Sequence, residues 1–131
     1  MIKKSIFVIM IFLFVVFVLF GCSGAKKSDP AAVTFAYLEA LSKKDKAEVI
    51  NRSCKAWEEQ ASLEVDALLS VGAKLNNVQC NVIGADGEIQ LVKCLGALDL
   101  TYNDEIRAID LSQRTYLMAL EDGQWRVCAY K

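Results

Sequence analysis

The stretch DPAAVTFAYLEALSKKDKAEVI, residues 29–50, decides the fold class, because it encodes two helices in succession before any strand appears. Asp29 followed by Pro30 is typical of a helix start, since an aspartate caps free backbone N–H groups and proline is tolerated in the first turn. Apolar residues then recur at helical spacing, which predicts a helix over 30–42.

The pattern restarts with a second and a third helix. Asp45 with Glu48 three residues later resembles a capping box, which predicts a short helix that ends near Cys54. A third helix is expected over 55–71, with Gly72 as its stop signal. The charge-rich part of this helix, which includes Glu58, Glu59, Glu64 and Asp66, is interpreted as a solvent-exposed face.

After Gly72 the apolar residues follow a period of two, which indicates strands. Val78, Cys80 and Val82 alternate with polar residues in the first of them. Gly-containing or polar turns then separate four strands, the third over 107–120 and the last over 125–130. The turns are expected at 85–87, 102–105 and 121–124.

Helices grouped before strands predict an α+β fold, in which three N-terminal helices pack on one face of a curved four-stranded antiparallel sheet. The opening stretch 29–50 and the ending YLMALEDGQWRVCAY, residues 116–130, resemble the NTF2-like superfamily. Small bacterial lipoproteins of the DUF4878-like group are similar in length and in strand count. A cystatin-like sheet with fewer helices is the nearest structural alternative.

The N-terminus has the features of an export signal. Lys3 and Lys4 precede an almost wholly apolar run over 5–20, which is slightly short for a membrane-spanning helix. The run ends in Leu19-Phe20-Gly21-Cys22, which resembles the lipobox of bacterial lipoproteins. That resemblance implies lipid, such as palmitate, on the Cys22 thiol; an uncleaved membrane helix is the alternative.

The chain of 131 residues therefore divides into three parts. Residues 1–21 are expected to be a lipoprotein signal peptide, 22–28 a lipidated cysteine with a flexible tether, and 29–131 a single domain. The expected location is the bacterial cell envelope, anchored by lipid to the membrane and facing outside the cytoplasm.

The four remaining cysteines suggest two disulfides, because an even number in an exported domain is typical of an oxidising compartment. A zinc site is the competing interpretation, but no Cys-x-x-Cys pair is present. The strand layout places Cys80 and Cys94 on neighbouring strands, and a further strand separates Cys94 from Cys128. The favoured pairing is therefore Cys80 with Cys94 and Cys54 with Cys128.

The charge balance and the composition argue against several classes of function. Without Lys3 and Lys4 the chain has 13 basic and 16 acidic residues, so nucleic acid is not expected as a partner. The sequence has no histidine, which removes the commonest general base and the commonest metal ligand. We expect neither a cofactor nor a bound metal.

The NTF2-like resemblance implies a cone-shaped cavity between sheet and helices. Its candidate lining residues are Tyr37, Asp110, Arg114 and Tyr116, the last three of which share strand parity within 107–120. A carboxylate base beside a phenol would suit enolisation, whereas polar side chains on an outer sheet face would be merely solvated. The expected role is non-catalytic, either binding a small apolar ligand or docking an envelope protein. The alternative is an enzyme, an isomerase or a hydro-lyase.

Overall fold

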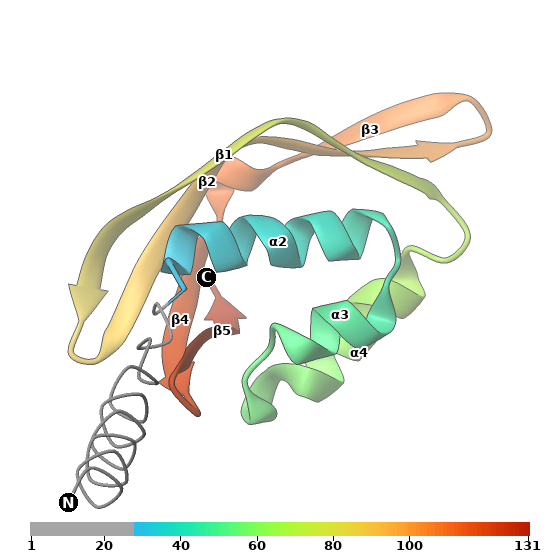
Figure 1. Ribbon diagram of the computed structural model, residues 1–131. Coiled ribbons are helices and arrows are strands. Elements are labelled where there is room, and N and C mark those ends of the chain that lie inside the picture. Colours follow the sequence, from blue (N-terminus) through green and yellow to red (C-terminus); the bar gives the residue numbers. More distant parts are fainter. Residues whose placement is uncertain (1–27) are drawn as a thin grey trace, which may run out of the picture.

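The computed structural model describes residues 28–131 (Figure 1). The expected signal peptide, the lipobox Cys22 and nearly all of the tether lie outside the described residues. Within the described part of the chain, no helix is both long and apolar enough to cross a membrane.

The described part of the chain begins with helices, as the sequence predicts. They are α2 (Pro30–Ser42), α3 (Lys46–Asn51), the 3₁₀ turn η2 (Lys55–Trp57) and α4 (Glu58–Ala67). The Asp29 carboxylate accepts a hydrogen bond from the backbone N–H of Ala31 at 3.3 Å, and the Asp45 carboxylate accepts one from that of Glu48 at 3.1 Å. Both expected caps are therefore formed.

A five-stranded antiparallel sheet follows the helices. Its strands are β1 (Gly72–Asp86), β2 (Ile89–Tyr102), β3 (Glu105–Asp110), β4 (Thr115–Glu121) and β5 (Gln124–Tyr130). The order is β1-β2-β4-β5, and β3 pairs with the far end of β2. Helix α2 lies along the inner side of the curved β1 and β2, with α3 and α4 beside it (Figure 1).

The expected third strand over 107–120 is wrong, because the chain breaks it into two strands with the 3₁₀ turn η3 (Leu111–Gln113) between them. The Asp110 carboxylate caps this turn by accepting from the N–H of Ser112 at 2.9 Å. The Leu111 side chain is fully buried in the core. The chain turns at this point because Leu111 is buried and Asp110 caps η3. As a result, β3 and β4 pair with different parts of β2.

The expected third helix over 55–71 is also too long at both ends. At its start, the N–H of Cys54 donates to the carbonyl of Val127 on β5, which holds this segment extended beside the sheet. The chain then forms η2 before α4 begins. At its end, the N–H of Leu68 bonds back to Val65 and the chain turns into β1.

Both expected disulfides are present. Cys80 on β1 is directly opposite Cys94 on β2 and is bonded to it. Cys54 is bonded to Cys128 on β5, which ties the junction of α3 and η2 to the last strand. The pairing is the one that the strand layout favours, and β4 does separate β2 from β5.

The core lies between α2 and the concave face of the sheet. Its largest fully buried side chains come from both layers: Tyr37, Leu38, Val92, Leu111, Tyr116, Met118 and Val127. Two of them are tyrosines, whose hydroxyl groups need hydrogen-bond partners inside the protein.

Candidate functional site

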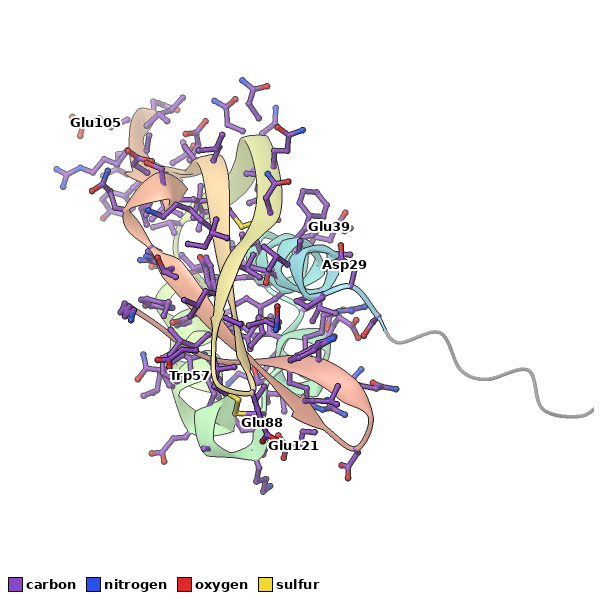
Figure 2. The ribbon with its side chains drawn as sticks, turned by 90° about the vertical axis from the view of Figure 1, so that its left-hand side faces the viewer. Asp29, Glu39, Trp57, Glu88, Glu105 and Glu121 are labelled. Atoms are coloured by element: carbon purple, nitrogen blue, oxygen red, sulfur yellow. A yellow bond between two sulfur atoms is a disulfide. The ribbon has the colours of Figure 1, made fainter. Side chains whose placement is uncertain are left out.

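Six side chains from five segments meet at one edge of the core, and we call them the Glu64 cluster. They are Tyr37 of α2, Trp57 of η2, Glu64 of α4, Arg114 immediately before β4 with Tyr116 of β4, and Tyr130 of β5. Figure 2 labels Trp57 beside the helical ribbon of η2 and α4.

A hydrogen-bonded chain runs through the cluster. The Tyr37 hydroxyl donates to Oε2 of Glu64 at 2.8 Å, and Nε1–H of Trp57 donates to the Tyr37 oxygen at 3.4 Å. Tyr37 is fully buried, whereas Glu64 and Trp57 are partly exposed. Through these bonds, Oε2 of Glu64 accepts from a neutral donor, the buried Tyr37 hydroxyl.

Three aromatic rings border this chain. The Tyr130 ring meets those of Trp57 and Tyr116 edge to face, with both centroid distances 5.7 Å. The Arg114 guanidinium lies over the Tyr130 ring, 4.3 Å from its centroid. This is a cation–π contact, and it holds Arg114 at the margin of the cluster.

Two oxygens of the cluster have no hydrogen-bond partner among the described residues. They are Oε1 of Glu64 and the Tyr116 hydroxyl, and both are shut off from solvent. A buried polar group without a partner costs about 1–3 kcal/mol, and more when it is charged. The nearest hydrogen-bonding side chains are Tyr130, which lies beside Glu64, and Arg114, which lies beside Tyr116.

Burial sets the protonation of the phenols. It raises the pKa of Tyr116 to about 12, although the nearby positive charge of Arg114 acts in the opposite direction. Burial, reinforced by the Glu64 carboxylate, raises the pKa of Tyr37 well above its ordinary value, and it raises that of Tyr130 as well. The three phenols are consequently neutral hydrogen-bonding groups at ordinary pH.

The structure brings together three of the four residues that the sequence suggested for a pocket: Tyr37, Arg114 and Tyr116. Asp110 does not join them, because it belongs to β3, is exposed and caps η3. The expected sharing of one strand face by Asp110, Arg114 and Tyr116 is wrong for the same reason.

Sequence reasoning missed Glu64, the central acidic residue, because it treated the charged residues of this helix as one solvated face. Glu64 lies three residues after the buried Ala61 and next to the buried Val65. Its spacing from these two apolar residues was the available signal that it faces inward. Tyr130 carried no signal beyond its place in the last strand.

Clefts on the surface of the described residues include three of moderate size. One of about 420 Å³ is bordered by Lys55, Glu58 and Glu121, and one of about 250 Å³ by Arg52 and Trp125. A third, of about 360 Å³, is lined by Val71, Leu100, Tyr102, Glu105 and Arg107. Figure 2 shows Glu105 at the opposite end of the molecule from Glu88 and Glu121.

The described part of the chain contains no group of three or more Cys, Asp or Glu side chains arranged to hold a metal ion. None of the three clefts is lined by a member of the Glu64 cluster.

Comparison with known proteins identifies the fold but no family. No protein-family model matches the sequence, and no curated protein matches it significantly. Among solved structures, the chain is similar to Pgp2, the helical cell shape determining protein of Campylobacter jejuni, with a TM-score of 0.51 and 8% identity. The match covers 76% of this chain and 38% of Pgp2, so the chain spans well under half of Pgp2's length.

An NTF2-like protein of unknown function from Cytophaga hutchinsonii also matches, with a TM-score of 0.41 and 11% identity. That match covers 82% of this chain and 95% of the other. At 8% identity, the likeness to Pgp2 is one of fold. The chain thus has an α+β architecture that also occurs within a larger protein.

Proposed function

We propose that this chain is an NTF2-like lipoprotein of the bacterial cell envelope whose domain binds a small molecule, without catalysis, at the Glu64 cluster. The observation that carries the proposal is the pair of buried oxygens without partners, Oε1 of Glu64 and the Tyr116 hydroxyl. The ligand would have a mainly apolar body, to suit the rings, and at least one hydrogen-bond donor.

Folded proteins pair nearly all buried polar groups, because each unpaired one lowers stability. Glu64 is held in place by Tyr37, so Oε1 cannot turn to water without breaking a 2.8 Å bond. A ligand that donates to Oε1 removes the cost of the orphaned group, and this gain favours binding.

The proposed location has separate support. The lipobox resemblance at Cys22 implies a lipid anchor, and the two disulfides suit an oxidising compartment outside the cytoplasm. Helix α2 begins at Pro30, eight residues after Cys22. A lipid on Cys22 would therefore keep the domain close to the membrane surface.

One observation favours the enzyme alternative. The unpartnered oxygen of Glu64 could accept a proton from a bound ligand, while the neighbouring phenols could donate hydrogen bonds to an oxyanion. An isomerase or hydro-lyase would use such a pair. This alternative requires that the ligand be recovered in altered form after incubation with the protein.

Native mass spectrometry of the full chain, purified from its own host in detergent, tests the binding proposal. We expect a small molecule to co-purify with the wild type and to be depleted in the Tyr116→Phe variant. Tyr102→Phe is the matched control, because Tyr102 is exposed and lies away from the cluster. A wild-type protein that carries no small molecule but retains a stable protein partner would contradict the proposal and favour docking.

The lipid anchor is tested separately. The wild type should take up labelled palmitate and sediment with membranes, whereas Cys22→Ala should do neither. Cys54→Ala is the control, since Cys54 pairs with Cys128 and should leave labelling intact. Labelling that persists in Cys22→Ala, or that never occurs in the wild type, would refute the anchor.

A further inference from the structure

Of the strands at the edges of the described sheet, β3 is the one whose edge is unprotected. Strand β1 has two irregularities of register, after Asn76 and after Val82, which bend an edge away from further pairing. Strand β5 is bridged by Ser53 at Val127 and bonded to Cys54. Strand β3 pairs regularly with β2 along its whole length, and no described strand pairs with its other edge. Such an edge is a template for a further strand.

The turn before β3 determines which backbone groups lie along this edge. Tyr102 and Glu105 flank a two-residue turn in which Asn103 and Asp104 have φ values of +47° and +64°. In such a turn the N–H of the fourth residue bonds back to the first, so the backbone groups of Glu105 point toward β2. Because the direction alternates along a strand, the N–H and C=O groups of Ile106 point away from β2.

The side chains of β3 have opposite charges two residues apart. Glu105 and Arg107 share one face of the strand, both line the cleft of about 360 Å³, and neither forms an ion pair with another described residue. Ile106, between them on the other face, is 68% exposed, more than any other large apolar side chain of the described residues. Figure 2 shows Glu105 at one end of the molecule, where a partner can approach.

We infer that β3 pairs edge to edge with β3 of a second copy of this chain, antiparallel and about a two-fold axis at Ile106. In this register Glu105 of each copy lies opposite Arg107 of the other, so two ion pairs form on one face. The two Ile106 residues exchange backbone hydrogen bonds, and their side chains meet on the other face. A second copy fits this edge because a strand with opposite charges at this spacing complements itself when it is antiparallel.

Sedimentation velocity of the full chain in detergent, with micelles in excess over protein, measures the monomer–dimer equilibrium as the protein concentration rises. Strand β3 has 6 residues, so the contact is small and the dimer should be weak and reversible. Glu105→Arg or Arg107→Glu places like charges opposite each other twice and should weaken the dimer by about tenfold. Glu59→Arg makes the same change in net charge as Glu105→Arg at an exposed position of α4, and it should leave the dimer unchanged.

Two further measurements test the register. The Glu105→Arg strand has two positive charges and the Arg107→Glu strand two negative ones, so a mixture of the two variants should form a mixed dimer about as tightly as the wild type. In Ile106→Cys the two copies of the residue would be opposed within the Cα–Cα range of a disulfide, so mild oxidation should link them. Ile83→Cys, at a position of β1 that is 54% exposed, is the control and should link far less.

A wild type that stays monomeric would overturn the inference, as would an edge that pairs with a different protein and not with its own copy. Equal effects of Glu105→Arg and Glu59→Arg would place the association elsewhere and would overturn it too. Failure of the two reversed variants to form a mixed dimer, or equal linking of Ile106→Cys and Ile83→Cys, would refute the antiparallel register. The Glu64 cluster contains no residue of β3, so these outcomes leave the small-molecule proposal unaffected.

Discussion

The hydroxyl of Tyr37 donates a hydrogen bond to Oε2 of Glu64 across 2.8 Å, and this bond joins helix α2 to helix α4. It fixes the carboxylate at the edge of the core, with Oε2 occupied and Oε1 unpartnered. The site that we propose depends on this arrangement. The same bond should also contribute measurably to the stability of the fold.

Replacement of Tyr37 by Phe should lower the free energy of unfolding by about 1.5–3 kcal/mol, because the partly buried carboxylate of Glu64 loses its donor. Urea denaturation followed by circular dichroism measures the effect. Tyr102→Phe is the matched control, since Tyr102 is 61% exposed, and its change should stay within about 0.5 kcal/mol. Equal losses in the two variants would mean that the Tyr37–Glu64 bond contributes nothing specific.

The two disulfides should differ in their contribution to stability. Cys54–Cys128 spans 74 residues of sequence and Cys80–Cys94 spans 14. The loop-closure model gives about 4 kcal/mol for the longer loop and about 3 kcal/mol for the shorter one. Denaturation of the two double-alanine variants tests the order, and a greater loss from removing Cys80–Cys94 would contradict it.

Alkaline pH should destabilise the fold through Tyr116. Its pKa rises to about 12 in the folded state from an ordinary value of 10.0, so the folded state holds the proton more tightly. The stabilisation is fully present below pH 10 and is lost as the pH rises through about 12, at about 2–3 kcal/mol in all. In Tyr116→Phe the fall in unfolding free energy between pH 10 and 12 should be shallower. An unchanged slope would refute the assignment of this loss to Tyr116.

Gly96 should tolerate no side chain, because β1 and β2 approach closely at this irregularity of their pairing. An added Cβ would lie 2.5 Å from the carbonyl oxygen of Asn77, and φ is +93°. Gly96→Ala should cost at least about 3 kcal/mol. Gly123→Ala is the control, since φ is +75° but nothing lies within 4 Å of the added atom, and it should cost about 1 kcal/mol. Equal costs would show that backbone conformation alone matters.

The sequence predicted helix ends correctly where residues within one turn of the helix determine them. Helix α2 has the predicted bounds, because Asp29 and Pro30 act within one turn of the helix start. The ends of α4 depended on contacts that no local pattern shows. The bond of Cys54 to Val127 on β5 delays its start, and that contact spans more than 70 residues.

The candidate site was predictable in part for the same reason. Tyr37 follows the apolar period of its helix, so its burial could be inferred. Tyr116 was predicted only as a member of one strand face with Asp110 and Arg114. Glu64 is a charged residue in a charge-rich helix, so its spacing from Ala61 and Val65 is a weak signal, and its bond to Tyr37 depends on how two helices pack. The break at Leu111 also depends on tertiary burial, which overrides the strand pattern on either side.

The central claim is that a small molecule from outside the protein donates hydrogen bonds to Oε1 of Glu64 and to the Tyr116 hydroxyl. A high-resolution crystal structure of the full chain, purified from its own host, tests it most directly. The account predicts ordered non-protein density larger than a single atom, within about 3.2 Å of both Oε1 of Glu64 and the Tyr116 oxygen. Density that shows water alone at these oxygens, or the Tyr130 hydroxyl bonded to Glu64 together with Arg114 bonded to Tyr116, would contradict it.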